Sequence, residues 1–466
     1  MVDLNRINQD KRLPERLRII PPEPDIVPEE VVTFDEKPER QEEKGKPADY
    51  FVPVDDSIGK ISDLVLSFYS GSNKGTRNSY AKIYADLIIK LARVYEKQDP
   101  PFNIIVVNPD NDPLILNRVH TAIQTLAEFT GSIIPGDPFV KFNTVNPQQN
   151  GLPIWIQDYF LTFQQNGKRA NAIRILENAT GKFNDNDAAN TITRQFGQHR
   201  QTKLQLDHSD LPFTGGNILF VGGYALVGYD NLFNKLGEIM PEEQFLKTFA
   251  KLTGIPKDKI ILLGAIEPPD ASFFEEGLSW LDFPTRQPLF HLDLFITPAG
   301  TVQQKGEKKY RLLIGDPVCH YHPYPKLLNF SKKVVEHFID KLSQIPDFCI
   351  YRNPLPLTYI DYNDGKQKKR KWFFASYNNC LVQFTEDGNK KDNYVFLPTY
   401  GSDYSSEYSG YKNTRGGDWS ELALFDQYNK SIWESLDFQV ISLTNYLPLA
   451  EHRGAVRCIT KVLQRQ

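Results

Sequence analysis

The fold of this chain is decided by two neighbouring segments, HLDLFIT (residues 291–297) and KKYRLLIGD (residues 308–316). The first begins with a short polar signature and becomes apolar, and the second is another apolar run after a turn, so the pair predicts two strands. This order occurs four times along the chain. The other copies are QDYFLTF with NGKRANAIRIL (157–176), GGNILFV with GYALVGY (215–229) and YNNCLVQF with NYVFLPTYG (377–401).

Helical patterns lie before these strand pairs and between the later ones. Apolar residues on one stripe predict a helix over residues 80–97, which Asn78 or Ser79 would cap. Further helices are expected at residues 114–129, 241–254, 326–343 and 420–436, and buried strands at 102–107 and 139–145. The alternation of helix and strand predicts an α/β protein. A repeated unit of two strands and a helix predicts a closed radial arrangement, with every polar signature facing one central cavity.

Composition and charge limit the class of protein. The 466 residues are 40% hydrophobic, 24% charged and 12% aromatic, which is typical of a globular protein and excludes collagen, coiled coil and full disorder. The net charge of −4 argues against a general nucleic-acid binder. The sequence has no run of about 18 apolar residues, so it predicts no membrane-spanning helix. The N-terminus has no apolar stretch of signal-peptide length, so we expect a cytoplasmic protein.

The first 50 residues differ in composition from the rest. They are rich in Pro, Glu and Lys and poor in aromatic residues, so they cannot bury enough apolar surface to offset the entropy of ordering. We predict a disordered or loosely docked tail over residues 1–50, with a partner-binding strand near residues 26–34 as the alternative. Residues 51–466 are then one catalytic domain.

Two motifs that contain aspartate lie at the start of predicted strands. In HLDLFIT, residues two apart share a strand face, so His291 and Asp293 are predicted to point the same way as an acid/base and cation-binding pair. In PIWIQDYF, Asp158 lies within an apolar stretch and must be paired, hydrogen-bonded or facing a cavity. The alternatives are a structural hydrogen-bonded pair and a carboxylate that caps a turn.

Two further motifs are informative mainly in combination with these. FTGGNILF places Gly215, Gly216 and Asn217 at a strand start, where glycine permits close approach of a ligand or another segment, or an ordinary turn. RGAVRCITKVL places Cys458 in a short apolar strand after a Gly-containing turn, as a nucleophile or as a buried structural thiol.

Taken in chain order, WIQD, GGN, HLDLF and a near-terminal cysteine in GAVRCIT resemble the guanidine-modifying pentein superfamily. The resemblance covers about residues 80–466, and WIQD and HLDLFITPAG are most similar to the protein-arginine deiminase catalytic domain, with similarity also to agmatine deiminases. It implies an α/β fold of the pentein type, a five-fold pseudosymmetric propeller around a central active-site cavity.

The resemblance also implies roles for particular residues. Cys458 matches the nucleophile, His291 the general acid/base, and Asp158 and Asp293 the two carboxylates that bind the guanidinium. Trp155 matches the aromatic residue beside the substrate channel. The substrate-binding candidates are Trp155, Gly216, Asn217, Arg415 and Arg453.

The implied activity is hydrolysis of a guanidino group to a ureido group with release of ammonia. The predicted substrate is an arginine residue in a protein or peptide, which would become citrulline. Agmatine or free arginine is the alternative substrate. Thr214, where free-amine deiminases often have glutamate, favours the first. An amidino transferase and a catalytically silent binding protein on the same scaffold are further alternatives, and the partners include neither nucleic acid nor membrane.

No cofactor is implied. Animal protein-arginine deiminases have acidic calcium ligands where this chain has Tyr159 and Leu161, which does not favour calcium dependence. The four cysteines are too widely spaced for a zinc knuckle or a disulfide framework. VCHYHPYP, with Cys319, does not supply a tetrahedral metal set, and KQKKRK (366–371) is expected to be a solvated hairpin loop.

Overall fold

The computed structural model describes most of the predicted catalytic domain. It covers residues 50–68, 74–95, 102–107, 117–123, 140–145, 155–165, 172–178, 189, 192–193, 203–209, 211–232, 239–264, 291–319, 326–363, 368–386, 390–401, 419 and 421–466. The tail predicted over residues 1–50, apart from Tyr50, lies outside the described residues, as does Arg415. The structure therefore bears on the catalytic domain alone.

The described strands form five separate sheets of three or four strands. Each sheet contains the same three-strand unit, in which an antiparallel pair is followed by a parallel neighbour. Among the described residues, four units have a helix between their parallel strands, and three of these four follow repeats that the sequence predicts. Those three are β8 (Ile218–Val221), β9 (Tyr224–Gly228), α5 (Glu242–Thr253) and β10 (Ile260–Leu263); β11 (Ile296–Gln304), β12 (Glu307–Val318), α6 (Lys326–Ser343) and β13 (Phe348–Asn363); and β15 (Leu381–Gln383), β16 (Tyr394–Pro398), α8 (Leu422–Ser435) and β17 (Gln439–Leu443). A chain that is mixed α/β with several small sheets is what the sequence predicts.

The first copy of the repeat forms a fourth unit, and the two ends of the described chain form the fifth. The fourth contains β5 (Phe160–Gln165), β6 (Ala172–Asn178) and β7 (Lys203–Ser209), with β1 (Phe51–Pro53) at its edge. The fifth contains β18 (Thr460–Arg465), β2 (Ile61–Ser67), α2 (Lys74–Tyr95), β3 (Phe102–Val107) and β4 (Val140–Val145). The short helices α9 (Leu447–Ala450) and α10 (Val456–Ile459) precede β18.

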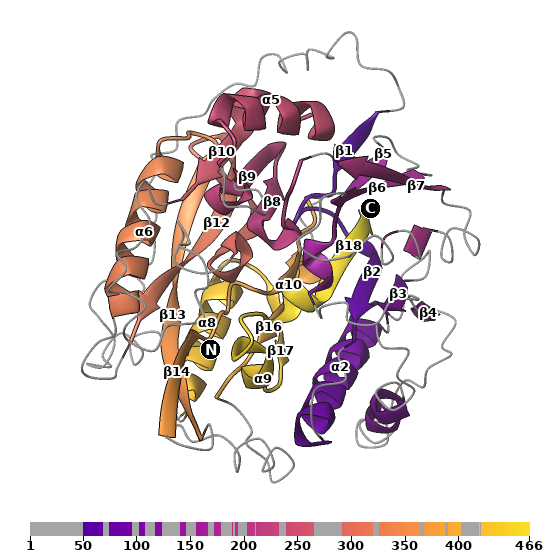
Figure 1. Ribbon diagram of the computed structural model, residues 1–466, viewed down its shortest axis with the longest axis vertical. Coiled ribbons are helices and arrows are strands. Elements are labelled where there is room, and N and C mark those ends of the chain that lie inside the picture. The colour runs from indigo at the N-terminus through magenta and orange to yellow at the C-terminus, as the bar shows by residue number, and fades with distance from the viewer. Residues whose placement is uncertain are drawn as a thin grey trace, which may run out of the picture.

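The pairing of β18 with β2 matters for the site, because β18 begins two residues after Cys458. The two strands are antiparallel, with Thr460 opposite Leu66, and they run side by side in Figure 1. Beyond the strand, Gln466 and Lys60 exchange both backbone hydrogen bonds, at 2.8 and 2.9 Å. The segment that carries the candidate nucleophile is thus held by a strand from the opposite end of the described chain.

Helix α5 illustrates how local sequence fixes these elements. Its first turn carries Glu242 and Glu243, which suit the positive end of the helix dipole, and Phe245 and Phe249 are buried on one stripe. It ends at Gly254, whose φ of 74° is left-handed and whose N–H donates to Ala250 O at 2.8 Å. In Figure 1 helices α2, α5 and α6 lie at the periphery, and α10 lies near the middle.

Two local expectations are wrong. The helix predicted from residue 80 begins at Lys74, so neither Asn78 nor Ser79 caps it. Lys368–Lys371 are not in a loop but in strand β14 (Lys368–Phe374), which pairs with β13. There the Arg370 guanidinium lies 3.6 Å from the ring centre of Tyr359 and pairs with Asp361, and these two contacts stabilise an extended conformation for this charged run.

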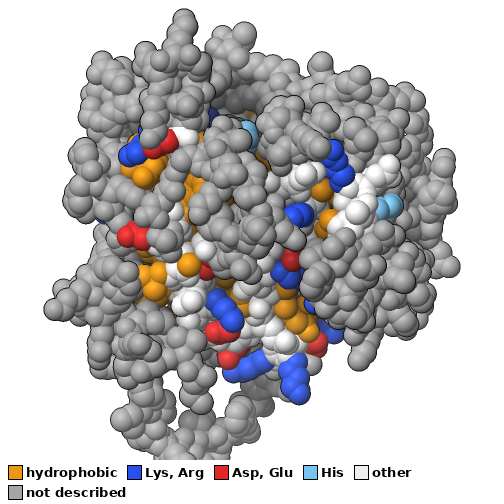
Figure 2. All heavy atoms as spheres, turned by 90° about the horizontal axis from the view of Figure 1, so that it is seen from below, with side chains coloured by type: hydrophobic (Ala, Val, Ile, Leu, Met, Phe, Trp, Pro, Cys, Tyr) orange, Lys and Arg blue, Asp and Glu red, His pale blue; other side chains and the backbone are white. Residues whose placement is uncertain are grey.

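The described surface carries both basic and acidic side chains (Figure 2), as the small net charge of −4 leads us to expect. On the face shown in Figure 2, basic and acidic side chains lie close to one another among the described residues. No helix within the described ranges is both long and apolar enough to cross a membrane.

Candidate active site

Each polar signature of the repeat forms one short turn immediately before a strand. Three of these turns are 3-10 helices, namely η2 (Ile156–Asp158), η3 (Gly215–Asn217) and η7 (Leu292–Leu294). Helix α10 occupies the same place before β18, and a bend at residues 377–379 occupies it before β15. The prediction that these residues lie in strands is therefore wrong. Contacts join η2 to η3, η3 to η7 and α10 to η2, so the side chains of different turns meet one another instead of lying along a sheet face.

Asp158, His291 and Gly216 meet at one point. The N–H of Gly216 donates to Asp158 Oδ1 at 2.9 Å, and His291 Nδ1 lies 3.6 Å from the same oxygen. The Asp158 and His291 side chains are 6% and 5% exposed. A Cβ on Gly216 would lie only 2.6 Å from His291 Nδ1, 2.9 Å from Asp158 Oδ1 and 3.3 Å from Asp293 Oδ2, so only glycine leaves these three groups in place.

Asp293 lies between an arginine and the candidate nucleophile. Its Oδ2 accepts a hydrogen bond from Arg457 Nη1 at 2.8 Å and lies 3.9 Å from Cys458 Sγ. Its Oδ1 is buried, and among the described residues it has no hydrogen-bond partner. A fully buried carboxylate with one unsatisfied oxygen is ready to accept hydrogen bonds from a cationic ligand.

Cys458 lies within α10 and is 3% exposed. Its Sγ accepts a hydrogen bond from Asn379 Nδ2 at 3.1 Å, and its N–H donates to Asn379 Oδ1 at 3.1 Å. Cys458 thus lies beside Asp293, in a helical turn and not in the strand that the sequence predicts.

Burial sets the protonation state of the unliganded site. Desolvation raises the pKa of Asp158 from 3.8 to about 8, and the nearby Asp293 carboxylate adds to that rise. Desolvation also raises the pKa of Asp293, to about 6, because Arg457 only partly offsets it. Desolvation, with Asp293 and Asp158, raises the pKa of the Cys458 thiol well above its usual range. At pH 7 Asp158 therefore retains its proton, Asp293 is mostly ionised and Cys458 is a thiol.

The other substrate-binding candidates occupy different parts of the region. Trp155 is half-buried, and its ring lies against Gly454, where a Cβ would come within 2.4 Å of it. Asn217 is buried and joins two turns, because its Oδ1 accepts the N–H of Leu292 at 3.2 Å. Arg453 lies at the turn before Gly454 with a left-handed φ of 67°. Direct contact of these residues with substrate stays a prediction, as it does for Arg415.

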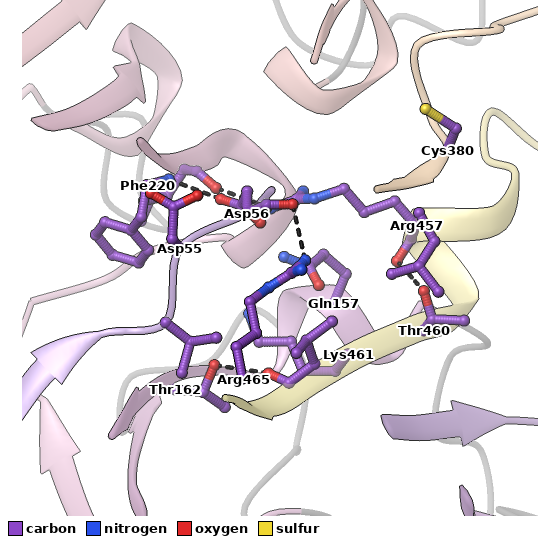
Figure 3. Close-up of a pocket in the computed structure, with 14 residues that line it drawn as sticks. Asp55, Asp56, Gln157, Thr162, Phe220, Cys380, Arg457, Thr460, Lys461 and Arg465 are labelled. Carbon is purple, nitrogen blue, oxygen red and sulfur yellow. Dashed lines mark hydrogen bonds and ion pairs between the residues drawn. The ribbon is translucent and has the colours of Figure 1, made fainter. Parts of the chain in front are cut away.

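A small cavity lies beside Arg457, the residue that precedes Cys458 (Figure 3). Its polar lining includes Asp55, Asp56, Gln157, Lys461, Arg465 and Arg457, which also contacts Asp293, and apolar residues such as Phe220 complete its wall. Its volume of about 20 Å³ suits one water molecule.

Gln157 faces this cavity. With its amide oriented to satisfy its neighbours, its oxygen accepts from Arg457 Nη2 at 2.9 Å and from Lys461 Nζ at 3.2 Å. Burial, and after it the positive charge of Arg457, lower the pKa of Lys461 to about 7. Gln157 thus supports Arg457 from the cavity side.

The positions that bear on metal binding contain core side chains. Tyr159 and Leu161 are each 1% exposed and pack in the apolar core beside β5. Within the described part of the chain, no group of three or more His, Cys, Asp and Glu side chains is arranged to hold a metal ion. Of VCHYHPYP, only Val318 and Cys319 are among the described residues.

Sequence reasoning missed two residues of this site, Asn379 and Arg457. Asn379 occupies in YNNCLVQF the place that Asp158, Asn217 and Asp293 occupy in the other signatures, so the repeat itself could have identified it. Arg457 directly precedes Cys458, but its partners Asp293 and Asp56 are 164 and 401 residues away, and no local pattern indicates that pairing.

Comparison with known proteins supports the fold. No protein-family model and no curated protein sequence matches this chain. Among solved structures, one provisionally assigned as an agmatine deiminase matches with a TM-score of 0.52 and 14% identity, over 88% of this chain and 95% of that one. Structures of a DDAH from Pseudomonas aeruginosa and of a dimethylarginine dimethylaminohydrolase adduct match with TM-scores of 0.36 and 10% identity, over 86% of this chain and 98% of each of theirs. The first match shows that this chain shares the fold of that structure.

Proposed function

We propose that this chain is a cysteine-dependent hydrolase that converts a guanidino group to a ureido group and releases ammonia. The observation that carries the proposal is the position of Asp293, whose Oδ2 lies 3.9 Å from Cys458 Sγ while its buried Oδ1 has no partner among the described residues. The five similar sheet units support an arrangement as a five-fold pseudosymmetric α/β propeller, with the site in its central cavity and residues 51–466 as one domain.

Two carboxylates suit a planar cation with several N–H donors. Asp293 Oδ1 and the Asp158 carboxyl group would hold the guanidinium nitrogens by charge-assisted hydrogen bonds and so place its central carbon near Cys458. The bound cation lowers the pKa of Asp158 and of the Cys458 thiol, because it favours the ionised form of each. Substrate binding thereby generates the thiolate that the empty site disfavours.

The reaction then proceeds in two stages. Cys458 gives its thiol proton to His291 and the thiolate adds to the guanidinium carbon. His291 then passes that proton to the leaving nitrogen, so that ammonia departs and a thiouronium intermediate remains on the sulfur. His291 next takes a proton from water, the oxygen adds to the same carbon and the C–S bond breaks. The products are a ureido group, ammonia and the regenerated thiol. None of these steps requires a metal or an organic cofactor, and we expect activity without calcium.

We propose a small guanidino compound such as agmatine as the substrate class, in preference to arginine residues in proteins. The match to the structure assigned as an agmatine deiminase favours this class. The preference for protein arginine drew on HLDLFITPAG, on Thr214 and on the WIQD motif, in which Gln157 faces Arg457 and Lys461 in the cavity of Figure 3. Gln157 therefore binds Arg457, and we infer that it does not select the substrate. Cytoplasmic location stays an expectation.

The test is ammonia release from a panel of agmatine, free arginine, methylated arginines and blocked arginine peptides, with and without a strong chelator. Ureido products are measured in parallel. We expect turnover of a small compound, equal with chelator and with added calcium, and none with Cys458→Ser. Faster turnover of the peptides would restore the protein-arginine assignment. Turnover by Cys458→Ser would contradict covalent catalysis, and no release by the wild type from any compound would favour a silent binding protein.

A further inference from the structure

Asn379 is held in the bend before β15 by contacts on all sides. It is 0% exposed, its N–H donates to Ser376 Oγ at 3.1 Å, and the hydroxyl of Ser376 in turn donates to the carbonyl oxygen of Leu294 at 2.5 Å. The carbonyl oxygen of Asn379 accepts the N–H of Val456 at 3.1 Å. This bend is therefore joined both to the turn that carries Asp293 and to the helix that carries Cys458.

The orientation of the Asn379 amide is fixed by its four hydrogen bonds. Its Oδ1 accepts the N–H groups of Ala455 and Cys458, at 2.9 and 3.1 Å. Its Nδ2 donates to Cys458 Sγ at 3.1 Å and to the carbonyl oxygen of Asp293 at 3.3 Å. The reversed amide would direct N–H groups at two N–H donors, so only this orientation is satisfied. One hydrogen of the amide therefore faces the sulfur.

From this geometry we infer that Asn379 is a further catalytic residue, which stabilises the Cys458 thiolate through Nδ2 and fixes the rotamer of its side chain. A single amide that binds both the N–H and the Sγ of one residue locks the torsion between them. A hydrogen bond from a neutral donor to a thiolate is stronger than one to a thiol, so the contact favours the reactive form. This inference rests on the proposed role of Cys458 as nucleophile.

The stabilisation is needed because the surroundings of the sulfur oppose its ionisation. Burial and the carboxylates of Asp293 and Asp158 raise the pKa of the Cys458 thiol, and the hydrogen bonds from the Ala455–Cys458 turn and from Asn379 lower it. Of these favourable contacts, the Asn379 side chain is the one that substitution can remove.

Asn378 provides a matched control. It is the neighbouring residue of the same bend, is also 0% exposed, and has an amide paired with Asn353 and with the carbonyl oxygen of Leu313 at 3.0 Å. It faces away from the sulfur. A change at Asn378 therefore reports the cost of disturbing the bend without touching the nucleophile.

The experiment measures the rate at which chloroacetamide alkylates Cys458 as a function of pH, by mass spectrometry of the peptide that contains it, together with a melting curve. No substrate is required, so a protein without guanidino hydrolase activity still gives a result. For Asn379→Asp we expect the pH midpoint to rise by at least about one unit and the rate at pH 8 to fall about tenfold or more. Asn378→Asp should lower the melting temperature and leave the midpoint unchanged.

Asn379→Ser covers the case in which the aspartate variant does not fold, since its short hydroxyl can accept a backbone N–H without reaching the sulfur. The same rise in midpoint is expected. A folded Asn379 variant with the wild-type rate and midpoint would overturn the inference, and so would an equal shift in Asn378→Asp. Failure of the proposed function would be distinct, because ammonia release would then be absent from a wild type in which Asn379 still controls Cys458.

Discussion

Arg457 donates from Nη1 to Asp293 Oδ2 at 2.8 Å, so a carboxylate proposed to bind a substrate guanidinium is already paired with a guanidinium of the chain itself. The second terminal nitrogen, Arg457 Nη2, donates to Asp56 Oδ1 at 2.6 Å, and Asp56 lines the cavity in Figure 3. Arg457 directly precedes Cys458, so the residue that pairs with Asp293 and the proposed nucleophile belong to the same helical turn, α10. The second oxygen, Oδ1, has no hydrogen-bond partner among the described residues, as the proposed binding of a substrate requires.

Replacing Arg457 should alter the pH dependence of activity. Arg457 holds the pKa of the buried Asp293 near 6 against desolvation, and Asp293 must be ionised to bind a cation. In Arg457→Leu that pKa rises, so the acid limb of the kcat/KM profile should move to higher pH and activity at pH 7 should fall. Removing one partner of a buried ion pair also costs about 3–5 kcal/mol of stability. Arg457→Lys, which keeps the charge, should move the limb less.

Arg465→Leu is the control for losing a buried arginine beside the same cavity. Arg465 is 4% exposed and donates to the backbone carbonyls of Ser57, Gly59 and Asp56. We expect lower stability with the acid limb unmoved. If Arg457→Leu also leaves the limb in place, the Arg457–Asp293 pair is purely structural.

Asp158→Asn should abolish efficient turnover and yet stabilise the fold at neutral pH. The folded protein holds the Asp158 proton up to about pH 8, whereas the unfolded chain releases it near 3.8. Between these values the native state binds more protons than the unfolded state, so this group costs stability progressively as pH rises. Calorimetry from pH 4 to 9 should show the variant gaining on the wild type through this window. A difference in melting temperature that is constant with pH would contradict the raised pKa.

The catalytic effect of the same substitution follows from the lost charge. A neutral amide partner weakens the guanidinium clamp by about 2–5 kcal/mol, which lowers kcat/KM by roughly two to four orders of magnitude. Stability and activity should therefore change in opposite directions in one variant, as expected where a site holds buried charges for function.

A cationic reagent should modify Cys458 faster than a neutral reagent of the same shape. Chloroacetamidine carries the charge of a guanidinium and chloroacetamide does not, while both have the same leaving group. Because Asp158 and Asp293 raise the pKa of the thiol, a cation bound between them should promote its ionisation. After correction with a free thiol, we expect a preference of about a hundredfold or more, much reduced in Asp158→Asn. Equal rates would show that the bound cation does not activate the thiol.

The sequence was sufficient to predict most of the strand and helix units, and it selected Asp158, His291, Asp293 and Cys458 as site residues, whose roles stay predictions. Apolar runs of strand length and amphipathic stripes of helix length carry that information locally. The match of β3 to residues 102–107 and of α6 to residues 326–343 follows directly from such patterns.

The turns that carry the site could not be recognised in the same way. The alternation in Leu292–Leu294 has the period of a strand, and a three-residue 3-10 turn is too short to produce a period of its own. Whether such a segment extends or turns is decided by the packing of its neighbours, for example by Asn217, which binds the N–H of Leu292 from 75 residues away. Arg457 was missed for the same reason, since its partners are distant in sequence.

Gly454→Ala should impair substrate binding through Trp155. A Cβ at this position would lie 2.4 Å from Cζ3 of the Trp155 ring, far inside contact distance, so the ring must move. Overpacking of this kind costs about 1–3 kcal/mol. We expect a higher KM with a smaller change in kcat. The double variant Trp155→Phe with Gly454→Ala has room for the methyl group and should recover part of the loss, and failure to recover would place the effect in the Cys458 turn instead.

Gly216→Ala should inactivate the protein while leaving it folded. The added methyl group would stand 2.6 Å from His291 Nδ1 and 2.9 Å from Asp158 Oδ1, and it would have to push apart the proposed general acid/base and one of the proposed guanidinium-binding carboxylates. A displacement of about 1 Å at reacting groups costs about a hundredfold in rate. Gly223→Ala is the control, because its φ of 83° strains an alanine but no other atom lies within 4 Å of the new methyl group. Strain alone costs about 1–2 kcal/mol and should leave kcat/KM near the wild-type value. An active Gly216→Ala with the wild-type pH profile would mean that the His291–Asp158 contact does not take part in the reaction, since no arrangement with both side chains in their present places can accommodate that methyl group.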